Sequence, residues 1–535
     1  MASSLHQFLI ISDLTLNTFF AEISIEENLQ QFLIVLSVSL SVATISRFSS
    51  WFRQIPYTLL LVIVGLGLAF VNIRLVDLSP ELILEIFLPP LLFEAAWNIK
   101  WEELKKNFIP VILLATIGVI ISIIGVSFSL SHFTSMPIAI ALLVGASLSA
   151  SDPVAVVALF RELGASKKLT TLLEGESLLN DGVAVVAFIL LVGIPLGQNT
   201  FSFTDSIIQF TTFVGIGTAV GLLIGFGISY LTQRFDLPLV EQSLTLVSAY
   251  GVYLVTEKLG GSGVIGVVVV GLILGNFGSR IGMNPRTRLV VSEFWEFLAF
   301  LVNSIIFLLI GDQINFADLI THLDVIFVAI IALVVTRFIA IFILSYISNL
   351  ITVNEINWRE QTVLWWSGLR GSVSIALALS VPTILSQRQE VIETVFGVVL
   401  FTLLVQGLTT KLFLEKLNLI GNQVLKQEYS ELLARRFALN KVLDYLKSIP
   451  LDQTPEIDPE FYGYEEKLIE GQLENIKEKI VDLQQKNPEF KTISMKKLKE
   501  NLLNIEADTY AELILKGELN KDLSPILQEI IAKEQ

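Results

Sequence analysis

Long apolar runs follow one another through the first 415 residues, and they limit the chain to one class of fold. Each run holds about 15–28 residues with few charges, and about 20 apolar residues in a helix cross the ~30 Å hydrocarbon core of a bilayer. Charged residues make up only 16% of the sequence, against about a quarter in a soluble protein. We therefore expect an all-α, polytopic membrane protein, and soluble enzymes are excluded. The predicted spans, about thirteen, are 29–47, 57–73, 80–97, 108–130, 137–160, 170–194, 206–232, 239–257, 263–277, 290–311, 319–346, 361–385 and 390–414.

The charges that flank these spans predict their orientation. With the loops numbered in order, the odd loops hold about thirteen Lys and Arg residues, whereas the even loops hold only Arg74, Lys258 and Arg388. Loops rich in Lys and Arg stay on the cytoplasmic side of a membrane. We therefore expect the N-terminal segment 1–28 to be extracytoplasmic or interfacial and the C-terminus to be cytoplasmic. The expected location is the plasma (inner) membrane.

Residues 421–535 differ in composition from the spans. They are rich in Glu, Lys, Leu and Ile at helical spacing, as in "YEEKLIEGQLENIKEKIVDLQQK", and prolines interrupt them near 450–459 and at 488. This pattern predicts soluble amphipathic helices after the last span. We expect a cytoplasmic regulatory tail that binds a ligand or another protein.

Cysteine content and charge exclude several kinds of chemistry. The sequence has no cysteine, which removes disulfides, thiolate metal sites and cysteine nucleophiles. A formal net charge of −15 argues against nucleic acid as a partner. We expect no cofactor.

The fifth predicted span contains a helix break within a polar sequence, "GASLSASDPVAVVALF". Pro153 has no N–H, so the carbonyl of Ser149 loses its helical hydrogen bond beside Ser147, Ser151 and Asp152. In hydrocarbon such a break survives only where protein or water covers it. Free carbonyls, hydroxyls and a carboxylate at this depth are typical of a transporter ion site. The structural alternative is a proline kink that packs against a neighbouring helix.

The sixth predicted span adds four polar side chains within two helical turns. Ser177 and Asp181 are four residues apart and share one helix face, and Glu176 and Asn180 form such a pair on the neighbouring face. Ionisable residues inside a membrane are unfavourable by at least ~2.5 kcal/mol each and are functional candidates by default. We expect the carboxylate of Asp181 to have a functional role, whereas that of Glu176 could serve purely as an ion-pair partner.

Two arginines in later spans are candidate counter-charges. Arg337 lies deep in the eleventh span and Arg370 in the twelfth, and a buried guanidinium needs an anion or free carbonyls. Gly368 and Gly371 around Arg370 predict a second interrupted helix. The first broken helix is the fifth span counted from span one, and the second is the fifth counted from span eight. The two six-helix sets are therefore offset by seven spans, and an odd offset inverts one set relative to the other in the membrane. Paired breaks in two inverted repeats predict a secondary transporter.

Four motifs, on spans five, six, ten and twelve, carry a family resemblance. "SASDPVAVVALFRELGASKKL", "LLEGESLLNDGVAVVAF", "EFWEFLAFLVNSIIFLLIG" and "GLRGSVSIALAL" resemble the cation:proton antiporters of the NhaP type, which include the eukaryotic sodium–proton exchangers. The resemblance covers an antiporter domain of about residues 29–415, without the tail. It implies a homodimer in which a mobile core, about 108–194 and 319–414, contains crossed discontinuous helices. The scaffold or dimerisation helices would be about 29–97 and 239–311.

The resemblance also implies roles for the polar residues. Asp181 would bind the cation or the proton, and Asn180 would hold the cation in place. Further ligands would come from Ser151, Asp152 and Ser177. The residues expected to form an ion pair and to support the crossing helices are Glu176, Arg337 and Arg370.

Together these features predict a sodium–proton antiporter that works by alternating access in the lipid bilayer. Burial favours the neutral form of Asp181, so a proton or a sodium (or lithium) ion neutralises it in turn. Because Asn180 rather than a second acid stands beside it, we expect electroneutral exchange of one cation for one proton. Potassium is the alternative cation, since hard oxygen ligands suit either ion. A cation channel and a non-transporting sensor are the alternatives outside this class.

Overall fold

The structure is a computed structural model of the whole chain. It describes residues 30–45, 56–71, 75–76, 78–197, 203–232, 237–279, 283–314, 316–352, 354–419, 423–448, 458–487 and a few positions between 490 and 513. All regular secondary structure in these ranges is helical, so the all-α prediction is confirmed for them. The predicted segment 1–28 lies outside the described residues. The chain divides into two compact units, Met1–Ile420 and Gly421–Gln535, which are described separately.

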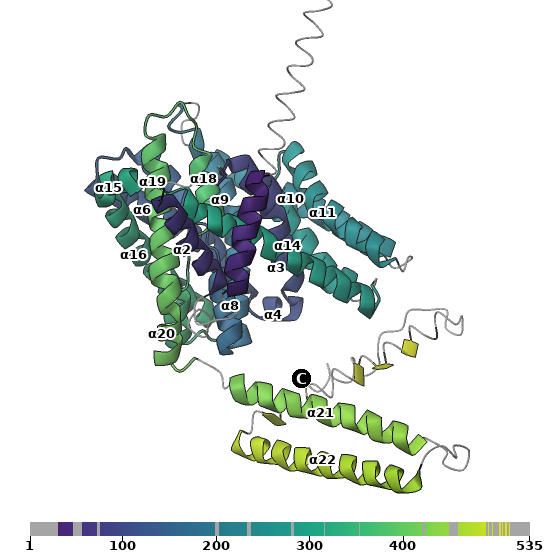
Figure 1. The fold of residues 1–535 in the computed structure, drawn as a ribbon. Helices are drawn as coiled ribbons and strands as arrows, with labels where there is room; N and C mark the ends of the chain where they lie inside the picture. Colours follow the sequence, from purple (N-terminus) through teal and green to yellow (C-terminus); the bar gives the residue numbers. More distant parts are fainter. Residues whose placement is uncertain are drawn as a thin grey trace, which may run out of the picture. The chain divides into compact units, whose positions relative to one another are not determined.

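The helices of the first unit follow the predicted spans along the chain (Figure 1). Labels with η denote π-helical turns, in which the backbone hydrogen bonds span five residues. In order, the elements are the helix Gln30–Ile45, α2 Tyr57–Phe70, η2 Leu82–Phe87, α3 Leu88–Asn98, α4 Trp101–Lys106, α5 Phe108–Leu113, η3 Leu114–Gly118, α6 Val119–Phe133, α7 Ile138–Ser147, α8 Val154–Leu163, α9 Lys167–Val192, α10 Phe203–Thr232, α11 Pro238–Lys258, α12 Gly263–Ile273, η4 Leu274–Gly278, α14 Pro285–Asp312, α15 Phe316–Thr321, α16 Leu323–Ile351, α17 Trp358–Trp366, α18 Ser372–Leu379, α19 Arg388–Phe401, η5 Thr402–Gly407 and α20 Leu408–Lys416.

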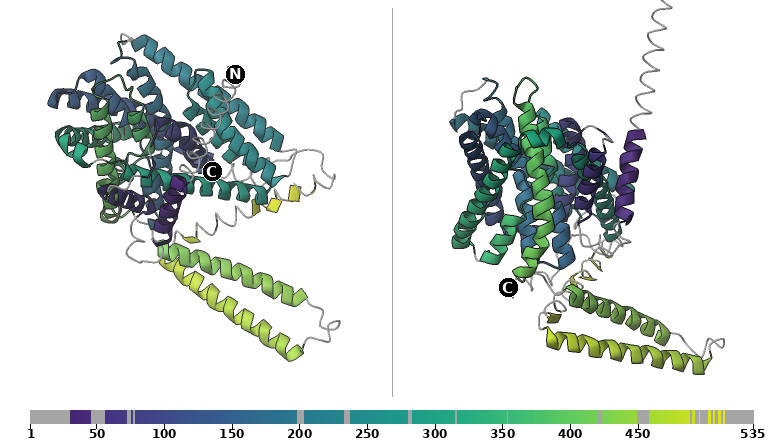
Figure 2. Two further views of the ribbon diagram at one scale, coloured as in Figure 1. Left: turned by 45° about the horizontal axis from the view of Figure 1, so that its top comes forward. Right: turned by 60° about the vertical axis from the view of Figure 1, so that its left-hand side comes forward.

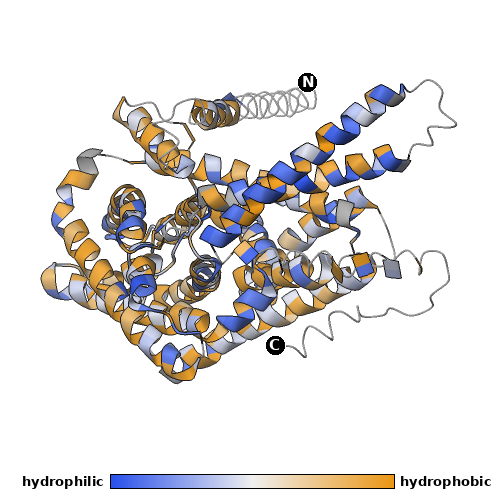
Figure 3. Ribbon diagram, turned by 90° about the horizontal axis from the view of Figure 1, so that it is seen from below, coloured by the Kyte–Doolittle hydropathy of each residue, from blue (hydrophilic) through white to orange (hydrophobic). Residues whose placement is uncertain are grey.

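The length and apolarity of these helices are those of a multi-pass membrane protein. Colouring by hydropathy shows the helices of the first unit as predominantly hydrophobic (Figure 3). Among the described residues, six continuous helices are long and apolar enough to cross a bilayer. They are Phe108–Phe133, Lys167–Val192, Thr204–Thr232, Thr287–Asp312, Leu323–Ile351 and Arg388–Lys416. Each predicted span overlaps a helix or a pair of helices separated by a break. The number of about thirteen crossings stays a prediction.

Two groups of helices can be distinguished by their packing. In the first group, α14 packs against α2 and α3, and α12 packs against α3, α10 and α11. In the second group, α6 packs against α7 and α16, and α19 packs against α7, α16 and α18. α10 and α11 lie on one side of the unit, and α6 and α16 lie on the other (Figure 1 and Figure 2). The division into a mobile core and a scaffold stays a prediction, because one arrangement does not show which group moves.

Both predicted helix interruptions are present. α7 ends at Ser147 and α8 begins at Val154, while α17 ends at Trp366 and α18 begins at Ser372. The first break follows from Pro153, which stands directly before α8 and has no N–H to donate. Each interruption leaves backbone groups unpaired in the middle of the protein, and these groups need other partners.

Glycine at the second interruption permits two side chains to approach the backbone. A Cβ atom at Gly368 would overlap the side chain of Arg337, and one at Gly371 would overlap that of Asp152. The two glycines therefore permit a close approach that a Cβ atom would prevent. They let an arginine from α16 and an aspartate from the α7–α8 break lie against the α17–α18 break.

The second unit contains an antiparallel pair of helices, α21 Gln423–Ser448 and α22 Pro459–Lys486. Its small core includes Tyr429, Ile480 and Phe490, with the rings of Tyr429 and Phe490 stacked at 4.9 Å. Lys447 near the end of α21 lies 3.1 Å from Glu470 of α22. The side chain of Asp458 caps α22 by accepting from the Glu460 N–H. The hairpin is amphipathic, with hydrophilic and hydrophobic residues interspersed along it (Figure 3).

Candidate functional site

The two interrupted helices meet at their breaks and are joined there by hydrogen bonds. The Asp152 N–H donates to the Leu369 carbonyl at 2.8 Å, which connects the first break to the second. The Ser374 hydroxyl of α18 donates to the Ala150 carbonyl at 3.2 Å. Backbone groups that leave the helical pattern at one break are thus paired at the other, as a buried chain segment in a membrane requires.

Residues of α9 hold the first break through Ser151. The amide of Asn180 donates from Nδ2 to Ser151 Oγ at 2.6 Å and accepts from the Ser151 N–H at 3.2 Å. The Ser177 hydroxyl donates to the Ser151 carbonyl. All three side chains are at most 3% exposed. The structure therefore brings together three of the predicted site residues, with Ser151 at their centre.

Asp181 is a predicted site residue whose carboxylate has unused hydrogen-bonding capacity. It lies one residue beyond Asn180 on α9, and its side chain is 9% exposed. Its Oδ1 atom has no hydrogen-bond partner among the described residues. Asp152 and Arg370 are close enough to act on its charge. A buried carboxylate oxygen without a donor is strongly unfavourable unless a proton or a cation binds it.

The carboxylate of Asp152 is already bound by backbone groups. Its Oδ1 accepts from the Val154 N–H at 3.0 Å, and the backbone of Ser372 lies close enough to stabilise its charge. Val154 and Ser372 begin α8 and α18, so one carboxylate faces the N-terminal ends of both helices. The positive ends of helix dipoles stabilise an anion at this position.

The positive charge of Arg370 lies at the C-terminal end of a helix, in contrast to the negative charge of Asp152 at helix N-terminal ends. Its Nη1 donates to the Ser149 carbonyl at 2.7 Å and to the Ala150 carbonyl at 2.8 Å, just beyond the end of α7. Its backbone N–H donates to Oγ1 of Thr402 at 3.0 Å. A buried arginine is expected to bind either an anion or free carbonyl groups, and Arg370 binds carbonyl groups.

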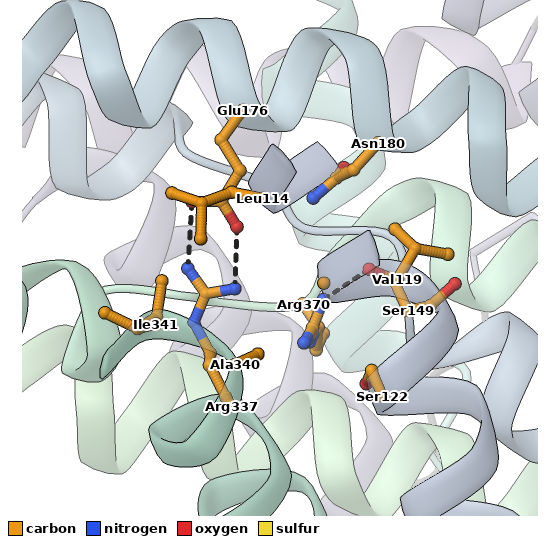
Figure 4. Close-up of a pocket in the computed structure, with 11 residues that line it drawn as sticks. Leu114, Val119, Ser122, Ser149, Glu176, Asn180, Arg337, Ala340, Ile341 and Arg370 are labelled. Atoms are coloured by element: carbon orange, nitrogen blue, oxygen red, sulfur yellow. Dashed lines mark hydrogen bonds and ion pairs between the residues drawn. The ribbon is translucent and has the colours of Figure 1, made fainter. Parts of the chain in front are cut away.

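Glu176 and Arg337 form an ion pair in the interior. Arg337 Nη1 donates to Glu176 Oε1 at 2.9 Å and Nη2 to Oε2 at 3.3 Å, and both side chains are less than 10% exposed (Figure 4). Arg337 also donates to the carbonyls of Leu364 and Trp365 at the end of α17. The pair therefore joins α9, α16 and α17, and it satisfies the carbonyls that the end of α17 leaves unpaired.

A second contact joins α9 and α17 near their N-terminal ends. Lys168 Nζ lies 2.8 Å from Glu360 Oε2 and 2.5 Å from the Glu355 carbonyl. Glu360 also completes a capping box with Asn357 at the start of α17. Two polar contacts, one at the start of α17 and one at its end, hold this helix against α9.

The candidate site offers oxygen ligands rather than a cluster of metal-binding side chains. Among the described residues, no group of three or more His, Cys, Asp and Glu side chains could hold a metal ion. The predicted site residues Asp181, Asp152, Ser151 and Ser177 offer carboxylate and hydroxyl oxygens, which are ligands for hard cations.

Several residues that build the site are not among those predicted from the sequence. Thr402 accepts from the Arg370 backbone, Leu369 accepts from Asp152, and Ser374 donates to Ala150. Thr402 and Ser374 are polar residues inside apolar spans, which is a signal that could have identified them. Leu369 contributes through its backbone carbonyl, and no pattern of side chains in the sequence indicates that contact.

Comparison with known proteins identifies the family. Residues 36–416 match the family described as "Sodium/hydrogen exchanger, transmembrane". The Na(+)/H(+) antiporter ApNhaP of Aphanothece halophytica is 64% identical over 523 residues, 98% of this chain and 100% of that protein. The low-affinity Na(+)/H(+) antiporter NhaS1 of Synechocystis sp. is 60% identical over 509 residues, 94% of this chain and 96% of that protein.

A solved structure has a similar fold. The sodium proton antiporter MjNhaP1 from Methanocaldococcus jannaschii superposes with a TM-score of 0.59 at 21% sequence identity, covering 73% of this chain and 98% of that one. At this identity the similarity concerns the fold alone. Because the family match spans well over half of the sequence, and two relatives are at least 60% identical over nearly the whole chain, this protein belongs to the sodium/hydrogen exchanger family.

Proposed function

We propose that the protein is a secondary sodium–proton antiporter that exchanges one Na⁺, or Li⁺, for one H⁺ by competition at Asp181. The observation that carries this proposal is the buried Oδ1 of Asp181, which has no hydrogen-bond partner among the described residues. Either a proton or a cation at this oxygen removes the unfavourable free energy of the bare buried carboxylate. Family membership and the two sodium–proton antiporters that cover almost all of the chain support the same activity.

The site residues have distinct roles in this proposal. Asp181 binds the transported ion, with oxygen ligands from Ser177 and Ser151. Asn180 fixes the position of Ser151 through its two hydrogen bonds. Asp152 adds negative charge next to the cation while the ends of two helices keep it in place.

The charges around the site favour electroneutral exchange. Glu176 is paired with Arg337, and Asp152 faces two helix N-termini, so neither carboxylate needs to change its protonation during transport. Asp181 is then the one acid in this group that alternates between a proton and a cation, each carrying a single positive charge. The loaded site has the same net charge in both halves of the cycle, which makes exchange of one ion for one proton electroneutral.

Alternating access of this site rests on an architecture that we also propose. About thirteen helices cross the membrane, and they form two inverted six-helix repeats whose fifth helices are interrupted and cross at Asp152 and Leu369. The core, 108–194 and 319–414, moves against the scaffold, 29–97 and 239–311, within a homodimer. Support comes from the two breaks that meet and from the polar contacts that join α9, α16 and α17.

Orientation and the tail belong to the same proposal. The distribution of Lys and Arg over the loops supports an extracytoplasmic N-terminus and a cytoplasmic C-terminus in the plasma (inner) membrane. The helical hairpin α21–α22 then lies in the cytoplasm. Its separate small core supports a role as a regulatory module that binds a ligand or a protein.

Exchange in everted membrane vesicles tests the activity and its ion. Vesicles from a host without its own antiporters are acidified inside, and a pH-sensitive dye follows the release of protons after addition of sodium, lithium, potassium or calcium salts. We expect a response to sodium and lithium. A response to potassium alone would assign the other cation, and uptake of labelled sodium that needs no proton gradient would indicate a channel.

A further inference from the structure

The interior of the first unit contains a small polar cavity that adjoins the proposed cation site and shares Asn180 with it. It has a volume of about 20 Å³, and it is lined by residues of η3, α6, α9 and α16 and of the two helix breaks (Figure 4). Its polar lining consists of Ser122, Ser149, Glu176, Asn180, Arg337 and Arg370. Asp181 does not line it.

We propose that this cavity binds one ordered water molecule, held by Arg370, Ser122 and Glu176. A water needs about 10–15 Å³ of such space and two to four polar partners. The volume of the cavity is slightly larger than one water molecule needs. The proposal does not depend on sodium being the transported ion.

Two buried atoms on the cavity walls need a partner that the described residues do not supply. Arg370 is 1% exposed and Ser122 is 5% exposed. Arg370 Nε and Ser122 Oγ both have no hydrogen-bond partner among the described residues. In the view of Figure 4, Arg370 lies between Arg337 and Ser122. A buried polar group without a partner is uncommon and is strongly unfavourable, and a bound water is the usual remedy.

The charges on the walls decide against an ion as the occupant. Two guanidinium groups and one carboxylate line the cavity, so a cation is disfavoured. A halide is larger than water and needs several donors, but Arg370 Nη1 is bound to two carbonyls and Arg337 is bound to Glu176 and the end of α17. Water fits because it accepts from one group and donates to others.

The water would complete the hydrogen bonding of a functionally important arginine. It accepts from Arg370 Nε and donates to the carboxylate of Glu176, while the Ser122 hydroxyl serves as its third partner. Arg370, Glu176 and α6 are then linked on the wall of the cavity. The guanidinium that closes the end of α7 has a partner for Nε as well as for Nη1.

A density map of the full-length protein at a resolution that shows ordered waters tests this directly. We expect a peak at hydrogen-bond distance from Arg370 Nε, Ser122 Oγ and a Glu176 oxygen. No peak in a map that shows waters at other buried sites would overturn the proposal. A peak that gives a bromide signal in crystals grown in bromide would overturn it too, because the occupant would be an anion.

Two variants fill the cavity from different walls. Ser122→Val removes the hydroxyl and adds volume, whereas Val119→Leu adds volume and keeps the hydroxyl, since Val119 also lines the cavity. Both should lose the density peak and lower the melting temperature. The matched control is Ser129→Val, on the same helix, whose hydroxyl donates to the Gly125 carbonyl outside the cavity.

The milder variant Ser122→Ala keeps the test informative if a larger side chain prevents folding. It removes one of three partners, so we expect a weaker peak and a melting temperature between those of the wild type and Ser122→Val. An unchanged peak in Ser122→Ala together with an unchanged peak in Val119→Leu would show that the water is not held as proposed.

Discussion

Arg370 donates a 2.7 Å hydrogen bond to the carbonyl of Ser149, the carbonyl that Pro153 leaves without a helical partner. A positive charge thus lies beyond the C-terminal end of α7, where the helix dipole is negative. Asp152, only three residues after Ser149, lies at the N-terminal ends of α8 and α18, where the dipoles are positive. The breaks are therefore stabilised by a positive charge at a helix C-terminus and a negative charge at two helix N-termini. Asp181 lies close enough to interact with both charges.

Asp181→Asn should abolish exchange and leave the folded protein intact, because it removes the group that alternates between proton and cation. An amide also supplies a donor and an acceptor, so the buried position stays polar without a charge. Exchange is measured with purified protein in liposomes over a range of pH. Asp324→Asn, at the exposed start of α16, is the control and should exchange like the wild type. Sodium-dependent exchange by Asp181→Asn would refute the central proposal.

Glu176→Gln should reduce stability because it leaves the Arg337 charge buried without its anion. Breaking a buried ion pair typically destabilises by ~3–5 kcal/mol. Arg337→Ala should reduce stability further, since it also removes two hydrogen bonds at the end of α17. Thermal unfolding of both single variants and the double variant measures the coupling between them, and the double variant should lose less than the sum.

The surface ion pair between Asp482 and Lys486 gives the matched control for this cycle. The two side chains are 57% and 68% exposed, so Asp482→Asn should change stability by less than ~1 kcal/mol. Strict additivity of Glu176→Gln and Arg337→Ala would mean that the buried pair does not contribute as an interacting unit.

Asn180→Asp tests the charge assignment. A protonated aspartate reproduces the hydrogen bonds of the amide, because one oxygen accepts from the Ser151 N–H and the hydroxyl donates to Ser151 Oγ. An ionised aspartate would lack that donor, so we expect the neutral form and electroneutral exchange with weaker sodium affinity. Exchange is followed while valinomycin and potassium set the membrane potential. A voltage-dependent rate for the variant would contradict this charge assignment, and one for the wild type would contradict the stoichiometry.

Gly371→Ala should destabilise the protein, since the added methyl group would overlap Asp152. Overpacking of this kind typically destabilises by about 1–3 kcal/mol. Gly251→Ala in the middle of α11 is the matched control, because open space surrounds that position. Alanine favours a helix over glycine by about 0.5–1 kcal/mol, so the control should unfold at the wild-type temperature or above it. Equal melting temperatures for the two variants would show that the break does not need glycine.

Much of this arrangement follows from local rules that act on the sequence. A proline inside a helix kinks or breaks it, which predicts the break at Pro153. The glycines around Arg370 indicate the second break. Helical spacing places Ser177, Asn180 and Asp181 within one turn or so of each other. The expectation that a buried arginine needs an anion or carbonyls also holds, with Arg337 taking both and Arg370 the carbonyls.

What the sequence could not provide is the pairing between distant segments. The spacing rule groups Ser177 with Asp181 and Glu176 with Asn180, yet in the structure Ser177 and Asn180 both bind Ser151. Periodicity within one helix does not say which neighbour faces it. Leu369 lies more than 200 residues from its partner Asp152, and Thr402, on another span, lies 32 residues from its partner Arg370, so both contacts depend on how whole helices pack.

The π-helical turn η5 lets one continuous helix, Arg388–Lys416, present different sides to different neighbours. A turn whose hydrogen bonds span five residues inserts about one extra residue, which rotates everything after it by about 100°. Before the turn, α19 packs against α7, α16 and α18; η5 then contacts α2, and α20 contacts α17. Because α2 packs with the first group of helices and α17 with the second, this span touches both groups. If the two groups move against each other as proposed, the contact between η5 and α2 is one that has to change, while the contacts of α19 with α7, α16 and α18 are kept.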